Sequence, residues 1–247
     1  MWAFWVGLLV SYKDYLVSYD QYRQSHSNYV VARQAYLNYQ TLTAKNEAQS
    51  KTLVMLKSRN ETLKTYLTVL RDKIKETDGV GALEEKGYVD QLENEIEWYQ
   101  NYQEELSSAG TLEDLLDSAK EGKRHYHNTE TLAYQVLTTV LAGKENLWRN
   151  RVIDQVVTIR KSLADIKEDG NKNTAKAERW LLEAENRITR SLEKQQKAEE
   201  ARSETAKSNN RSETYNQIQF ILAESHQYLK EANSFLRELM REIKTAD

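Results

Sequence analysis

The stretch that decides the fold is residues 12–36, YKDYLVSYDQYRQSHSNYVVARQAY, with its continuation to Ile74. Its first half repeats a side chain every three or four residues: Tyr12, Tyr15, Tyr19, Tyr22, His26, Tyr29, Arg33 and Tyr36. Its second half continues the rhythm with Leu42, Asn46, Gln49, Leu53, Leu56, Asn60, Leu63, Leu67, Leu70 and Ile74. This spacing places the side chains on one face of a helix, so the stretch predicts a long helix whose face packs against a partner.

The composition of the whole chain points the same way. Proline is absent from all 247 residues, although proteins usually contain about 5%. Ala, Glu, Leu, Lys and Arg together approach half of the chain, which is typical of long helices and coiled coils. The apolar fraction of 39% suits the narrow seam of a rod better than the core of a globe. We therefore predict an all-α protein.

Short turns with glycine or asparagine divide the chain into four predicted helices, at about 8–77, 83–109, 112–168 and 173–245. Because short turns make neighbouring helices antiparallel, we expect one elongated antiparallel bundle or coiled-coil domain over residues 1–247. Two places weaken the long helices. The heptad seam slips in phase between Tyr36 and Leu42, and the polar run 193–216 contains Asn209 and Asn210 as its best candidates for a break.

Charge and motifs exclude several functions. The formal net charge of −3 gives no general attraction to nucleic acid, and the absence of cysteine rules out thiol chemistry. None of the four histidines lies in the Glu-x-x-His motif of di-iron bundles, and no hydrolase, zinc-protease or phosphate-loop motif occurs. We therefore predict no catalytic, cofactor-binding or metal-binding residues, and expect a protein that is not an enzyme.

The acidic residues are concentrated in one part of the chain. Residues 78–121 carry 2 basic and 13 acidic side chains, a net charge of −11. This block separates two more basic segments, so its charge favours particular helix pairings. The alternative is an acidic surface for a basic partner.

The amino-terminal residues 2–10 allow two interpretations. They include Trp2, Phe4 and Trp5, but the apolar run is far shorter than the roughly 20 residues that span a bilayer. In the first interpretation these side chains extend the heptad seam. In the second, residues 2–10 are the end of a membrane anchor and contact the membrane. The chain would then be membrane-associated or extracytoplasmic, whereas the first interpretation leaves its compartment unknown.

Two sets of residues in the long stretch are candidates for interaction. Tyrosine buries a large ring but needs a hydrogen-bond partner, so a tyrosine seam is wetter than a leucine seam. The stripe is either a partly solvated bundle face or a docking surface for another protein or a second copy; its residues are Tyr12, Tyr15, Tyr19, Tyr22, Tyr29 and Tyr36. Asn46 and Asn60 lie fourteen residues apart on the same seam and are candidates for setting the register.

These observations favour a non-enzymatic structural or interaction protein: a coiled-coil scaffold, spacer or assembly subunit, membrane-proximal through its amino terminus if the anchor interpretation holds. It would bind a protein partner or associate with itself through the Tyr/Leu heptad face. The alternative is an extracytoplasmic helical-bundle sensor or ligand-binding domain of a membrane-anchored receptor. That alternative requires a pocket between helices.

Overall fold

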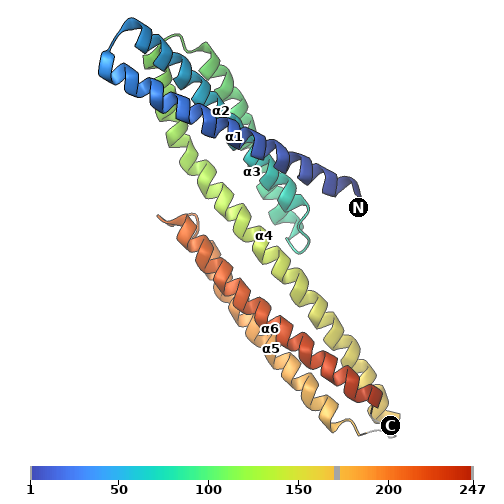
Figure 1. The fold of residues 1–247 in the computed structure, drawn as a ribbon. Helices are drawn as coiled ribbons and strands as arrows, with labels where there is room; N and C mark the ends of the chain where they lie inside the picture. Colours follow the sequence, from blue (N-terminus) through green and yellow to red (C-terminus); the bar gives the residue numbers. More distant parts are fainter. Residues whose placement is uncertain (1, 170–172, 246–247) are drawn as a thin grey trace. The chain divides into compact units, whose positions relative to one another are not determined.

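The computed structural model describes residues 2–169 and 173–245 (Figure 1). Within this part of the chain there are six helices and no strand, so the prediction of an all-α protein is confirmed. The helices are α1 (Trp2–Tyr39), α2 (Leu42–Lys75), α3 (Ala82–Ser108), α4 (Leu112–Asp169), α5 (Ala175–Ser203) and α6 (Arg211–Thr245).

Two of the expected helices match the structure within one residue at each end. These are α3 and α4, which were expected at 83–109 and 112–168. A reciprocal cap fixes the start of α4: the Asp114 carboxylate accepts hydrogen bonds from the Thr111 and Gly110 amides, and the Thr111 hydroxyl accepts one from the Asp114 amide. This helix also continues through Gly122 without reversing.

The expected single helix over residues 8–77 is wrong, because α1 ends at Tyr39 and α2 begins at Leu42. Gln40 takes a left-handed backbone conformation with φ of 51°, which stops the first helix. The Thr41 hydroxyl then accepts a hydrogen bond from the Ala44 amide and caps the second. Neither Gly nor Pro marks this reversal.

The expected helix over residues 173–245 is also two helices. α5 ends at Ser203, and a run of turns leads to Asn210, whose side chain accepts a hydrogen bond from the Glu213 amide at the start of α6. The break therefore falls in the polar run that the sequence analysis identified as weak. Because two of the four expected helices are each divided in two, the described residues contain six helices.

The helices form two compact units. The first contains residues 2–76 and 82–136, that is α1, α2, α3 and the first part of α4. The second contains residues 77–81, the rest of α4, α5 and α6. The single elongated coiled-coil domain over residues 1–247 stays a prediction.

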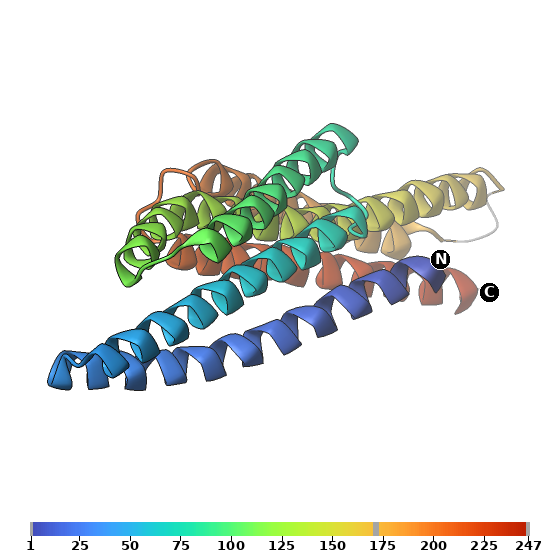
Figure 2. The ribbon, with the colours of Figure 1, turned by 90° about the horizontal axis from the view of Figure 1, so that it is seen from above.

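In the first unit α1 folds back along α2, and Figure 2 shows the two helices side by side. α3 packs on α2, and the first part of α4 packs against α3. A core cluster joins these elements, with Tyr22 and Tyr29 of α1 packed against it: Met55, Leu56, Tyr102, Leu106 and Leu115. The rings of Tyr102 and Trp98 stack at a centroid distance of 4.9 Å.

In the second unit α5 runs antiparallel to both neighbours. Ion pairs at both ends show this: Lys176 with Glu242 and Lys194 with Glu224 join it to α6, and Lys167 with Glu178 joins α4 to α5. Its main core cluster is made of small and aliphatic side chains, which allows close helix packing: Val152, Val156, Leu163, Ala177, Leu181, Ala184, Ala232, Leu236 and Leu239.

Asn60 is buried on α2, and its side-chain amide donates hydrogen bonds of 2.7 Å to the Tyr99 carbonyl and to Gln103 on α3. Removing both bonds in Asn60→Ala should lower the free energy of unfolding by about 1–3 kcal/mol. Asn46→Ala is the matched control on the same helix, because Asn46 is exposed, and should change it by no more than about 0.5 kcal/mol. Urea unfolding measures both; equal effects would contradict this account of Asn60.

Gly143 of α4 faces the turn at residues 77–81 within the second unit, where a Cβ would lie 2.5 Å from Val80 Cγ2. We expect Gly143→Ala to lower the midpoint of thermal unfolding. Gly87 lies inside α3 with open space around it, so Gly87→Ala should add about 0.5–1 kcal/mol of stability. Calorimetry on the Gly143→Ala and Gly87→Ala variants measures both effects. A Gly143→Ala variant that is more stable than the unchanged chain would show that the turn at residues 77–81 does not pack against Gly143.

Candidate interaction surface

The buried side of α1 carries small residues at every seventh position. These are Ser11, Ser18, Ser25 and Ala32, each no more than 7% exposed. Tyrosines alternate with them, four residues further on, and are half-buried: Tyr15, Tyr22, Tyr29 and Tyr36. We call these eight residues the inner seam. Small side chains allow the backbones of α1 and α2 to approach closely, while the tyrosine rings cover the edge of the contact.

Hydroxyl groups join the two helices at the middle of the inner seam. The Thr62 hydroxyl of α2 donates to the Ser18 carbonyl at 2.9 Å, and the hydroxyls of Ser18 and Thr65 are 2.7 Å apart. Beside them the rings of Tyr15 and Tyr66 lie with their centroids 5.4 Å apart. Because these bonds need short side chains on α1, the inner seam holds α1 in one register on α2.

The predicted tyrosine stripe is therefore divided between two faces. Tyr15, Tyr22, Tyr29 and Tyr36 belong to the inner seam, but Tyr12 and Tyr19 are 49% and 42% exposed. Burial and the neighbouring phenol groups of Tyr19 and Tyr12 raise the pKa of Tyr15. The sequence analysis missed the buried serines because it followed the aromatic residues; the seven-residue period of small side chains is the signal that identifies them.

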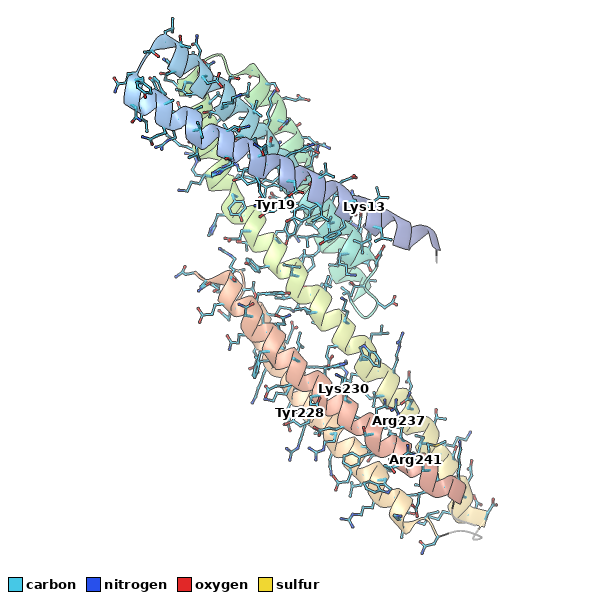
Figure 3. All side chains as sticks on the ribbon, in the orientation of Figure 1. Lys13, Tyr19, Tyr228, Lys230, Arg237 and Arg241 are labelled. Atoms are coloured by element: carbon cyan, nitrogen blue, oxygen red, sulfur yellow. The ribbon has the colours of Figure 1, made fainter. Side chains whose placement is uncertain are left out.

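The exposed side of α1 carries a second set of residues at heptad spacing. Its members alternate by three and four positions, and all are exposed: Leu9, Tyr12, Leu16, Tyr19, Arg23, His26, Val30, Arg33 and Leu37. We call them the outer seam. Figure 3 labels Tyr19 of this seam and the neighbouring Lys13 on α1. Apolar side chains at this spacing are the pattern by which one helix packs against another, yet within the first unit these side chains are exposed.

Other apolar side chains of α1, outside the outer seam, are also exposed to solvent. Val10, Val17 and Val31 are 51%, 58% and 69% exposed and lie on a third side of the helix. A helix with apolar residues all round is normally buried. Exposed large apolar side chains elsewhere, such as Phe220 of α6, are not arranged in a continuous heptad. α1 is therefore the best candidate for an interaction surface.

The remaining predicted site residues are placed as follows. Asn60 lies against α3, whereas Asn46 of the same helix is exposed. A role for either in setting the register stays a prediction. Trp2, Phe4 and Trp5 belong to the first turns of α1, but their side chains lie outside what the structure describes. Within the described residues, no helix is both long and apolar enough to cross a membrane.

A buried polar cluster in the second unit brings a serine, a histidine and a carboxylate together. Glu145 is 6% exposed and accepts hydrogen bonds from the Ser225 hydroxyl at 2.8 Å and from His226 Nδ1 at 3.2 Å. Ser225 also contacts Ser191 and Gln195 of α5. The serine bonds to the carboxylate rather than to the histidine, which is not the arrangement that activates a serine nucleophile. The cluster joins three helices instead.

A second polar cluster lies between α3 and α4 in the first unit. Glu95 accepts hydrogen bonds from His125 at 2.8 Å and Thr129 at 3.0 Å, and His125 stacks on Trp98. Tyr99 donates to Thr129, and burial raises its pKa to about 12. Among the described residues, no group of three or more histidine and carboxylate side chains is placed to hold a metal ion.

A pocket of about 250 Å³ lies between α4, α5 and α6 of the second unit. Arg149 lines it, with an apolar wall from Leu192, Ile218 and Leu222. Arg149 donates a hydrogen bond to Gln195 and has no carboxylate partner among the described residues. This volume lies just below the roughly 300–1,000 Å³ of most ligand sites.

Comparison with known proteins adds no relative: no protein family, curated protein or solved structure matches the chain. The geometry of α1 defines the class of site, a heptad-patterned helix face.

We predict that the inner seam tolerates only small side chains. In Ser25→Leu a bulky group would separate α1 from α2, so the free energy of unfolding should fall by about 1–3 kcal/mol. Ser27→Leu is the matched control, because Ser27 is exposed two residues away on the same helix. Denaturant unfolding followed by circular dichroism compares them. A Ser25→Leu protein as stable as Ser27→Leu would mean that the two helices do not meet at this seam.

Proposed function

We propose that the protein is a non-enzymatic interaction protein that presents the outer seam of α1 as a docking surface for a helix of another polypeptide. The one observation that supports this most is the exposure of a heptad of apolar and aromatic side chains along most of a 38-residue helix. The role of such a protein is that of a scaffold, spacer or assembly subunit.

The way α1 is held supports the proposal. The inner seam attaches α1 to α2 through buried small residues and hydroxyl bonds. The outer seam lies about a quarter of a turn further round the same helix, so it is presented in a fixed orientation. A rigid support of this kind reduces the entropy lost when a partner binds. Apolar anchors with basic residues between them also suit a helix that carries both apolar and acidic side chains.

A second candidate function, a ligand-binding bundle, rests on the pocket at Arg149. Its apolar wall and the Arg149 guanidinium, which bonds Gln195 but no carboxylate of the described residues, suit a small molecule with an anionic group. The pocket is small, and the other arginine that lines it, Arg202, is already bound to Glu199 on the same helix. The docking surface on α1 is therefore the better supported function.

Photo-crosslinking tests the docking surface without assuming the partner. A photoreactive phenylalanine in place of Tyr19 should give discrete crosslinked products when the full chain is irradiated in cells that naturally produce it. The same residue in place of Phe220 is the matched control, because Phe220 is a more exposed aromatic on α6. Products that are the same from both positions, or absent from position 19, would contradict the proposal.

A further inference from the structure

We propose that the helix that docks on the outer seam is α1 of a second copy of this chain, bound antiparallel. This inference rests on the proposed function and identifies its partner. The argument begins with Lys13 and Asp20, which lie seven residues apart on one flank of the outer seam, each directly after a tyrosine of that seam. Both are exposed, and neither forms an ion pair with any described residue.

A two-fold axis perpendicular to α1 makes these charges complementary. When residue i of one copy faces residue j of the other, the same symmetry makes j face i. An axis between residues 17 and 18 places Leu16 against Tyr19 of the second copy. The same axis leaves Lys13 only two residue positions, about 3 Å along the helix, from Asp20 of the second copy on the same flank, and Asp20 equally close to its Lys13. One short segment thus supplies both partners of two ion pairs and an apolar contact between them.

Charge on the seam also disfavours the other ways of covering it. A parallel pair in register would place Arg23 on Arg23 and Arg33 on Arg33, and like charges directly opposed are destabilising. Burial of the same arginines and of His26 in lipid would be costly. In the antiparallel register, Arg23 lies beside Tyr12 of the second copy, where a guanidinium can pack on an aromatic ring.

A charge exchange tests this pairing. In a dimer of the Lys13→Glu variant, two carboxylates should lie together at each end of the contact. In a dimer of the Asp20→Lys variant, two ammonium groups should lie together there. Each variant alone should therefore dimerise about tenfold more weakly than the unchanged chain. Mixed in equal amounts, the two variants restore opposite charges at both contacts. Sedimentation equilibrium at low salt should therefore show a mixed dimer of about the original affinity, together with fewer dimers of either variant alone.

Two exposed residues of α3 provide the matched control, because Lys86→Glu and Asp90→Lys change the same residue types away from the seam. Neither should alter dimerisation, and their mixture should show no preference. Circular dichroism checks that every variant keeps its helices.

The outcomes separate the inference from the function on which it rests. A dimer that ignores the Lys13 and Asp20 changes, or an unchanged chain that stays monomeric across a concentration series, overturns the antiparallel second copy. If position 19 nevertheless gives discrete crosslinks to another protein, the docking function stands and only its partner was wrongly assigned. The absence of both dimers and crosslinks removes both proposals.

Discussion

The structure of the first unit depends on the close contact between α1 and α2. Four small side chains seven residues apart allow the helices to meet, and hydroxyl bonds at Ser18 fix their register. The tyrosines are too large for the centre of this contact, so they line its edge. Everything proposed about α1 follows from this arrangement, because attaching one side of the helix determines which side is left to face a partner.

The second helix of the pair, α2, receives contacts on two sides. It packs against α1 through residues such as Thr62 and Thr65 and against α3 through Asn60 and Leu56. α1 packs along α2, and its Tyr22 and Tyr29 also pack against the core cluster. The exposed apolar side chains of α1 nevertheless leave much of its surface in water, which association with another chain would correct. Buried polar clusters at Glu95 and Glu145 join helices elsewhere in the chain.

Sequence patterns predicted the helical class and part of the helix boundaries. The turns before α3 and α4 were recognisable, because glycines and the capping residues Thr111 and Asp114 mark them. The reversal at Gln40 was not, since a left-handed glutamine is uncommon and the heptad rhythm continues on both sides of it. The slip in phase between Tyr36 and Leu42 was the visible sign of that reversal, but it was interpreted as an adjustment within one helix. The tyrosine stripe correctly predicted that the region of α1 is helical. Burial by α2 divides the tyrosines of the stripe between the inner and the outer seam.

A distance between α1 and α2 is the most direct test of this account. The chain has no cysteine, so Asp14→Cys and Lys64→Cys supply the only two attachment points for spin labels. Dipolar spectroscopy on the doubly labelled chain, diluted with an excess of unlabelled chain so that label pairs between two copies are not measured, should give one short distance, because the axes of packed helices are about 8–10 Å apart. A distance near 75 Å, which is about 1.5 Å for each of the intervening residues of a continuous helix, would contradict the α1–α2 hairpin and with it the outer seam.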